Sequence, residues 1–291
     1  MLSGSGGGGC LSEIYSLFRK AIPDPRLMTK GEMLMLQNVS EMHGLKIHAT
    51  DGEIGSVDQW FFDDRTWTIR YLVVDTGTWL PGKQVLISPT ALGETEWFAD
   101  AIHVSLTKEQ IENSPGIDAD KPVSREHEAE HVDRYGYAHY WRGRPDEGAS
   151  PADRLRVTGQ AARNKREPGS TLPEEQGDPH LRSTKEVVGY YIEARDGDIG
   201  HVEDFLVDPA TWSIKYMVVD TNNWWPGKKA LVATQWIERV SWEMTRVYVD
   251  LTQEIIKHAP EYNAETLVNR KYEDSLYEHY GRTKYWVEEI P

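Results

Sequence analysis

The segment of this chain that most resembles a reactive site is His127-Glu128-Ala129-Glu130-His131, which has the H-E-x-x-H spacing. On a helix this spacing places two imidazoles on one face, where they can bind zinc beside a glutamate that serves as a general base. The flanking residues, such as Arg125 and Asp133, are polar, whereas a metalloprotease helix is buried. The sequence therefore predicts a solvated helix here, with an adventitious surface metal site through His127 and His131 as the alternative.

Two pairs of acidic residues, Asp63-Asp64 and Glu203-Asp204, raise the question of acid–base catalysis. Such catalysis requires two carboxylates that converge on one substrate. Asp63 and Asp208 both follow β-rich stretches, at positions where aspartate commonly accepts hydrogen bonds from local backbone N–H groups. We therefore expect turn residues here and not catalysts.

The chain contains one segment twice. Gly44–Trp141 aligns with Gly189–Trp286 at a constant offset of 145 (189 − 44), without a gap, and 37 of the 98 aligned pairs are identical. We call these segments copy 1 and copy 2. In copy 2 the positions of His127 and His131 hold a tyrosine and a leucine, so neither imidazole is retained. A repeat of this length indicates two copies of one domain.

Both copies have a β pattern in their strongest shared block, which spans Asp51–Ile87 and Asp196–Val232. An Asp-Gly turn opens each block, and stretches rich in β-branched and aromatic residues follow, separated by a short polar turn. Helical turns are expected after the capping residues Thr107 and Thr252. We expect strands in copy 1 at residues 54–62, 67–74, 85–87 and 102–106, with equivalents in copy 2, and longer helices at 124–134 and 269–279.

The shared block reads DGxIGxVxxxxxDxxTWxIxYxVVDTxxWxPGKxxL, and it resembles the PRC-barrel family. That family includes the cytoplasmic domain of the photosynthetic reaction centre H subunit and the C-terminal domain of a ribosome-maturation factor. The resemblance implies a mainly β fold of two tandem PRC-type small β-barrels, each with short C-terminal helices. It also implies an assembly or interaction role, with no catalytic residues to carry over.

The domain organisation follows from the repeat and from local composition. We assign residues 1–30 to an N-terminal tail with a short amphipathic helix near 11–21, residues 31–141 to the first module, and residues 189–291 to the second. Residues 142–188 are polar and poor in large apolar side chains, so we expect a linker that does not fold by itself. The two modules are expected to pack as a pseudo-dimer, since a lone bent barrel leaves apolar strand faces exposed.

Composition narrows the classes of partner. The net charge of −15 (32 basic minus 47 acidic residues) disfavours nucleic acids and anionic membranes, whose binding depends on clustered Lys and Arg. No stretch approaches the roughly 20 apolar residues of a membrane span, and no signal-peptide pattern is present, so a cytoplasmic location is expected. The single cysteine, Cys10, allows no intrachain disulfide, and phosphate-loop and nucleophile-elbow motifs are missing.

These observations favour a non-enzymatic protein-interaction or assembly scaffold that needs no cofactor. The turns Trp79-Leu80 and Trp224-Trp225 are candidate contacts for a protein partner or for self-association, because tryptophan dominates many binding hot spots. Four tryptophans recur in both copies, and the plain interpretation places all of them in the core, with exposed contacts as the alternative for the two in these turns: Trp67, Trp79, Trp212 and Trp224. The alternatives are an RNA- or ribosome-associated maturation factor and a metal-binding protein or enzyme that uses the two histidines of the H-E-x-x-H segment.

Overall fold

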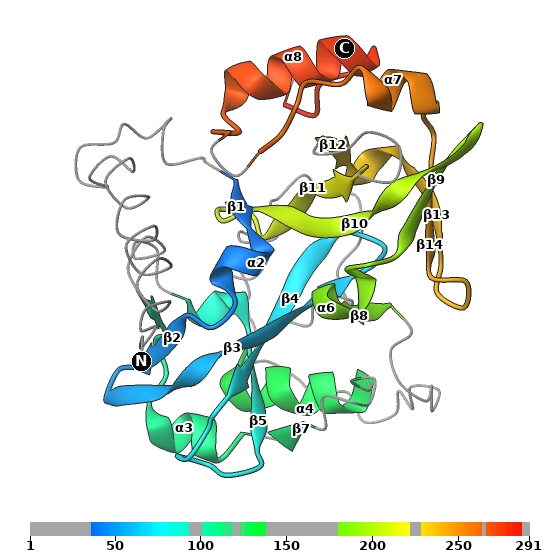
Figure 1. Ribbon diagram of the computed structural model, residues 1–291. Helices are drawn as coiled ribbons and strands as arrows, with labels where there is room; N and C mark the ends of the chain where they lie inside the picture. The colour runs from blue at the N-terminus through cyan, green and yellow to red at the C-terminus, as the bar shows by residue number, and fades with distance from the viewer. Residues whose placement is uncertain are drawn as a thin grey trace, which may run out of the picture. The chain divides into compact units, whose positions relative to one another are not determined.

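The structure is a computed structural model that describes residues 36–92, 101–114, 116–117, 123, 125–137, 180–221, 228–263 and 266–286 (Figure 1). The N-terminal helix expected near residues 11–21, and both Trp224 and Trp225, lie outside these residues. The described part is mainly β, as the sequence predicts, and its strands join one mixed sheet.

The elements of the two copies correspond closely. The first set is β1 (Gln37–Asn38), α2 (Val39–Met42), β2 (Lys46–Ala49), β3 (Gly52–Asp63), β4 (Thr68–Asp75), β5 (Gln84–Ile87), η3 (Pro89–Ala91), β6 (Ala101–His103), α3 (Lys108–Glu112), β7 (Gly116–Ile117) and α4 (Arg125–Tyr135). The second set is β8 (Leu181–Ser183), α6 (Thr184–Val187), β9 (Tyr191–Ala194), β10 (Gly197–Asp208), β11 (Ser213–Asp220), β12 (Lys229–Ala233), η6 (Thr234–Trp236), β13 (Ile237–Ser241), β14 (Arg246–Val249), α7 (Gln253–Lys257) and α8 (Arg270–Tyr280). The elements α2, β2, β3, β4, α3 and α4 recur with the same bounds 145 residues later, as α6, β9, β10, β11, α7 and α8. The strands and helices that the sequence predicts within the described residues are confirmed, with ends shifted by a few residues.

One boundary differs from expectation. The end of the segment that we assigned to a polar linker, residues 142–188, forms β8 and α6, which match β1 and α2 of copy 1. Leu181 and Val187 are buried there. The prediction relied on the average polarity of the segment, which does not reveal two isolated apolar residues. Two buried side chains are enough to hold a short strand and one helical turn against an existing core.

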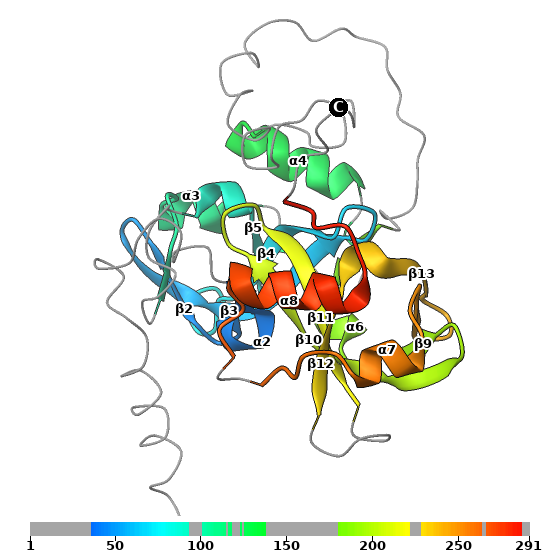
Figure 2. The ribbon, with the colours of Figure 1, turned by 90° about the horizontal axis from the view of Figure 1, so that it is seen from above.

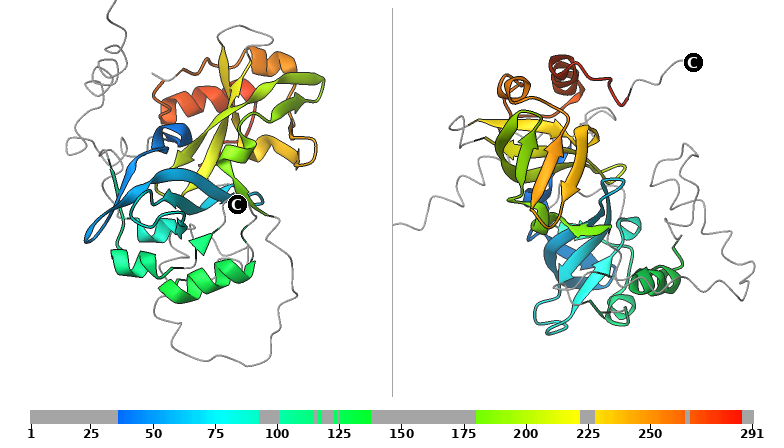
Figure 3. Two further views of the ribbon diagram at one scale, coloured as in Figure 1. Left: turned by 60° about the horizontal axis from the view of Figure 1, so that its bottom comes forward. Right: turned by 90° about the vertical axis from the view of Figure 1, so that its right-hand side faces the viewer.

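The two copies share one sheet, whose main path is β13-β14-β9-β10-β11-β4-β3-β2-β6. Figure 3 shows the blue and cyan strands of copy 1 beside the green and yellow strands of copy 2. The short strand that precedes each copy pairs with the long strand of the other copy. Gln37 lies opposite Val207, and Arg182 lies opposite Phe62. These two pairs are equivalent at the 145-residue offset, so the exchange is reciprocal.

The copies meet directly where β4 pairs with β11. The N–H of Ile69 donates to the carbonyl oxygen of Trp212 (2.8 Å), and the N–H of Ile214 donates to the carbonyl oxygen of Trp67 (2.7 Å). The two bonds are again related by the offset of 145. A local two-fold axis therefore relates the copies at this point, as it relates the halves of a symmetric dimer.

Aromatic rings fill the space around this junction. Trp60 lies 5.3 Å from Trp212 between ring centroids, and Phe62 lies 5.1 Å from Trp67 and 6.2 Å from Phe205. Trp67 and Trp212 have φ angles of 49° and 60°, in the left-handed region that non-glycine residues rarely adopt. As expected, Trp212 belongs to the buried core, whereas Trp67 is partly buried and packs against that core.

Two residues of the shared D-G-x-I-G block have roles beyond a turn. At Gly55 and Gly200 an added Cβ would lie 2.1 and 1.9 Å from the carbonyl oxygens of Asp75 and Asp220, so only glycine allows this close approach of strands. The aspartate that opens the block accepts a hydrogen bond at the start of the following short helix: Asp51 accepts from the N–H of Lys108, and Asp196 accepts from the N–H of Gln253.

We predict that the chain unfolds in a single cooperative transition, because both copies contribute to one sheet and to the larger cluster of buried hydrophobic side chains. Replacing Phe62 by Ala is expected to lower the free energy of unfolding by about 3–5 kcal/mol, since it leaves a cavity among rings from both copies. Differential scanning calorimetry measures the effect. Leu267→Ala, at an exposed position, is the matched control and should change stability by less than about 0.5 kcal/mol. Two separate transitions, of which Phe62→Ala moves only one, would contradict a shared core.

Candidate functional site

A buried polar cluster in copy 2 centres on the carboxylate of Glu273, on α8. Asn269 caps this helix by accepting from the N–H of Tyr272 (3.0 Å), and Gly281 ends it in a left-handed conformation. The helix lies over β11 and β12 (Figures 1 and 2), and the phenol of Tyr280 donates to the carbonyl oxygen of Leu231 (3.1 Å). Glu273 is thereby held between the helix and the sheet, with only 4% of its surface exposed.

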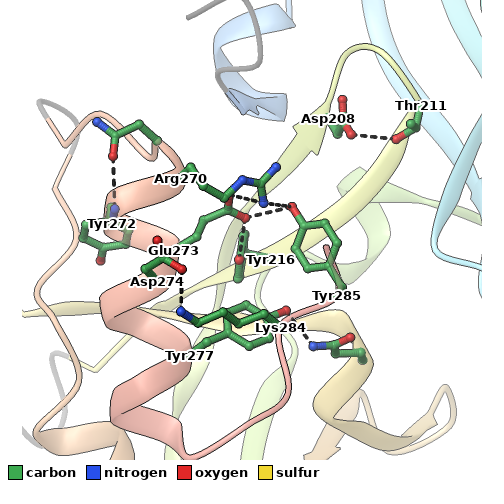
Figure 4. A network of polar contacts seen from close by, with 12 residues as sticks. Asp208, Thr211, Tyr216, Arg270, Tyr272, Glu273, Asp274, Tyr277, Lys284 and Tyr285 are labelled. Atoms are coloured by element: carbon green, nitrogen blue, oxygen red, sulfur yellow. Dashed lines mark hydrogen bonds and ion pairs between the residues drawn. The ribbon is translucent and has the colours of Figure 1, made fainter. Parts of the chain in front are cut away.

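Three side chains from different parts of copy 2 converge on Glu273 (Figure 4). The phenols of Tyr216, on β11, and Tyr285, after α8, each donate to its Oε1 over 2.8 Å. The guanidinium of Arg270 lies 2.9 Å from Oε2. Arg270 also stacks on Trp286, 4.3 Å from the ring centroid. The carboxylate thus joins a strand, a helix and the segment that follows the helix.

The electrostatics of this cluster favour a fixed structure over proton transfer. Burial raises the pKa of Tyr216 and of Tyr285, so both phenols keep their protons and act only as donors. Burial lowers the pKa of Lys215, whose ammonium lies 4.5 Å from the centroid of the Tyr285 ring. Both oxygens of Glu273 are engaged by these neighbours. The geometry therefore makes Glu273 a clamp that holds α8 and the Tyr285–Trp286 segment on the sheet.

The sequence repeats the whole cluster in copy 1, a signal that reasoning from local motifs missed. The counterparts are identical residues at the offset of 145: Tyr71, Arg125, Glu128, Tyr140 and Trp141. Tyr71 and Glu128 are buried, as are Tyr216 and Glu273, while Tyr140 and Trp141 lie outside the described residues. These residues lie far apart along each copy, yet they are identical in both copies. A comparison of the two copies could therefore have identified them from the sequence.

The H-E-x-x-H segment is not the solvated helix that we expected. Glu128 and His131 are fully buried, because α4 packs that face against the sheet. The Nε2 of His131 lies 2.9 Å from the carbonyl oxygen of Leu86, and since a carbonyl only accepts, Nε2 carries the hydrogen. Its ring contacts Tyr71 edge-on at 5.3 Å. The prediction of a solvated helix was wrong because a helix with many polar residues can still bury one face when the polar groups on that face are hydrogen-bonded.

This placement bears on the metal hypothesis for His127 and His131. His127 is half-buried, and burial lowers the pKa of both imidazoles. His131 occupies the position of Leu276 in copy 2, which is equally buried. Within the residues that the structure describes, no three His, Cys, Asp or Glu side chains are gathered as metal ligands. The ring of His131 therefore packs as a core side chain does.

The acidic pairs do not converge on a common point. Asp63 accepts from the N–H of Arg65 (2.9 Å), and Asp208 accepts from the N–H of Ala210 (2.9 Å), which confirms both as turn residues. Glu203 pairs with Lys229 at 2.6 Å. Its neighbour Asp204 points elsewhere, into the contact between the copies.

Asp204 anchors the segment that precedes copy 1 to β10 of copy 2. Its carboxylate accepts from the N–H (3.0 Å) and hydroxyl (2.6 Å) of Ser40, from the amide of Asn38 (3.0 Å), and from the N–H of Phe205 (2.8 Å). Burial raises the pKa of Asp204, and these four donors oppose the rise. In the equivalent contact, Ser183 donates to Gln59. A second buried acid is thus used to hold two segments together.

The turns proposed as contact sites are described only in copy 1. Trp79 and Leu80 lie after β4 and are partly exposed, and the Trp79 ring also packs against the core. The ammonium of Lys108 lies 5.5 Å from its centroid. Close by, Lys83 donates to the carbonyl oxygen of Ser114 (2.9 Å), beyond the end of α3. Lys83 therefore has a structural role that its sequence context did not indicate.

Comparison with known proteins adds no identification. No family model matches the chain, and no curated protein matches it. Among the described residues, no helix combines the length and the apolar character needed to cross a membrane.

We predict that Glu273→Leu lowers the free energy of unfolding by about 2–3 kcal/mol, because it leaves the buried phenol of Tyr216 and the more exposed phenol of Tyr285 without an acceptor and Arg270 without its partner. This figure is at the low end for a buried pair, since the guanidinium side is 45% exposed. Urea unfolding monitored by tryptophan fluorescence measures it. Glu278→Gln, at an exposed site on the same helix, should stay within about 0.5 kcal/mol of wild type. Equal effects of the two changes would exclude a clamp.

A second prediction concerns acid sensitivity. Burial lowers the pKa of His131 from 6.5 to about 4, so below pH 6.5 the unfolded chain takes up a proton there that the folded chain refuses. The contribution of His131 to stability is complete above pH 6.5 and falls as the pH drops towards 4, by up to about 3 kcal/mol. His131→Leu, which copies Leu276, should flatten this decline in unfolding curves recorded from pH 7 to pH 4. His258→Leu, at an exposed histidine, should leave it intact. A decline of equal size in all three proteins would refute the assignment.

Proposed function

We propose that this chain is a non-enzymatic protein-interaction or assembly scaffold, built from two PRC-type β-barrels that are locked into an intramolecular pair. The repeated block, the mainly β structure and the helices after each strand-rich region support the family assignment. We place the protein in the cytoplasm on the basis of its composition.

The main support for this proposal is that the buried carboxylates of Glu273 and Asp204 hold segments of the chain together. Enzymes keep their catalytic acids and bases where a substrate can reach them. Here Glu273 binds α8 and the following segment to β11, and Asp204 binds the segment that precedes the first copy to β10 of the second. Both carboxylates are occupied by donors from the chain itself. Such an arrangement serves a rigid framework that presents its outer surface to partners.

The surface that we assign to partner binding is the pair of Trp-containing turns. Trp79 and Leu80 follow β4, and Trp224 and Trp225 occupy the equivalent positions of copy 2. Two equivalent contact sites on one framework allow bivalent binding, which raises affinity without any new type of contact. A basic protein surface suits the net charge of −15.

The test is comparative capture from native cytosol with the immobilised full chain, quantified by mass spectrometry. We expect a defined set of proteins that the variant Leu80→Ser/Trp225→Ser retains at least tenfold less well, because hot-spot side chains are removed. Trp79 is left unchanged, since it also packs on the core.

The matched control is Met244→Ser/Leu267→Ser, at two other exposed apolar positions, and it should capture the same set as wild type. Thermal unfolding of each variant verifies that it is folded. Equal capture by all three proteins would remove the turns from the proposal. Retention of RNA that ribonuclease releases would instead favour the maturation-factor alternative.

A further inference from the structure

A row of three potential metal ligands crosses the outer face of copy 1, from β6 through β2 to β3. His103 lies opposite His48 in the parallel pairing of β6 and β2, and His48 lies opposite Glu53 in the antiparallel pairing of β2 and β3. Directly opposed residues of neighbouring strands project their side chains from the same face of the sheet, about 5 Å apart. None of these residues takes part in the Glu273 cluster or in the contact around Asp204.

The two imidazoles are already in contact. Their ring centroids are 5.4 Å apart and their planes differ by 29°. His103 is exposed and His48 is partly exposed, so an ion in solution can reach both. Zinc–nitrogen bonds of 2.0–2.1 Å in tetrahedral geometry require the two nitrogens to be roughly 3.3 Å apart. Rotation of the exposed His103 side chain and the partly exposed His48 side chain about their own bonds brings stacked rings of this separation into that range.

We propose that His48 and His103 bind one divalent transition-metal ion such as Zn²⁺, with Glu53 as a third ligand and water completing the coordination. Glu53 now forms an ion pair with Lys46 over 2.8 Å. Both of these side chains are about half exposed, and exposed pairs contribute little to stability, so the carboxylate is released at small cost. Imidazole nitrogen selects zinc, copper and nickel over magnesium, which prefers oxygen ligands.

The strands align the three ligands, but their side chains do not surround a common point. Within the described ranges, no three such side chains are gathered in that way. Metal binding therefore has to reorient His48, His103 and Glu53, whereas the strand register already supplies their order. A bound ion would connect β6, at the end of the sheet path, to the strands beside it.

Copy 2 provides an internal comparison. The equivalent row is Tyr248, Glu193 and Asp198, and Arg246 contacts both carboxylates, at 3.1 Å for Glu193 and 2.5 Å for Asp198. In copy 2 the positive charge between the acidic side chains on this face is the guanidinium of Arg246, whereas in copy 1 we propose a metal ion. The same scaffold accepts either set of residues, so exchanging residues between the copies changes the ligands without introducing a side chain foreign to the position.

The experiment is calorimetric titration of the metal-free full chain with Zn²⁺. We expect His48→Glu and His103→Tyr, which copy Glu193 and Tyr248, each to weaken binding at least tenfold. Glu53→Gln should weaken it several-fold. His127→Leu should leave the affinity unchanged, and Mg²⁺ should not bind. Thermal unfolding in EDTA confirms that the variants are folded.

A transplanted site makes the test independent of any loss of stability. The triple change Glu193→His/Tyr248→His/Arg246→Ala places the two histidines of copy 1 beside Asp198 of copy 2, with alanine as at position 101. We expect it to add a second equivalent of bound Zn²⁺ of similar affinity. Zinc binding that survives His48→Glu and His103→Tyr, or a transplant that adds none, would overturn the proposal.

Discussion

The structure depends on the two backbone hydrogen bonds that join the Trp67–Ile69 and Trp212–Ile214 segments across a local two-fold axis. They form only because both tryptophans adopt positive φ angles, which turn the chain so that β4 and β11 meet end against end. Left-handed backbone costs on the order of 1–2 kcal/mol at a residue other than glycine. The aromatic rings packed around the junction offset that cost, so the junction and the core stabilise each other.

The reciprocal exchange of short strands extends this junction into a large contact. β1 pairs with β10, the long strand of copy 2, and β8 pairs with β3, the long strand of copy 1. The long strand of each copy therefore has a neighbouring strand that comes from the segment before the other copy. Asp204 fastens one exchanged segment through Ser40 and Asn38. Buried polar groups of this kind specify a unique arrangement, because any other packing leaves them without partners. The two copies therefore form an intramolecular pseudo-dimer.

The copies share a scaffold but differ at selected positions. His131 in the core of copy 1 stands where copy 2 has Leu276, so only copy 1 has a titratable side chain at this buried position. On the outer face, the His48–His103 pair of copy 1 is replaced by Glu193 and Tyr248 in copy 2. Contacts between the copies require complementarity, whereas each outer face is free to diverge. The two copies therefore have the same fold but carry different residues on their outer faces.

The sequence alone determined the repeat, the β character and the places of most strands and helices, because alternating β-branched residues, Asp-Gly turns and helix caps act locally. It also identified the turn role of Asp63 and Asp208 correctly. Tertiary structure decided the rest. That Leu181 belongs to a strand, that His131 is buried and that Glu273 joins three segments all depend on which surfaces meet, and contacts between residues far apart in sequence leave no local pattern. Only the identity of the Tyr–Arg–Glu–Tyr set in both copies carried that information in the sequence, and its meaning became visible when the fold placed those residues around one carboxylate.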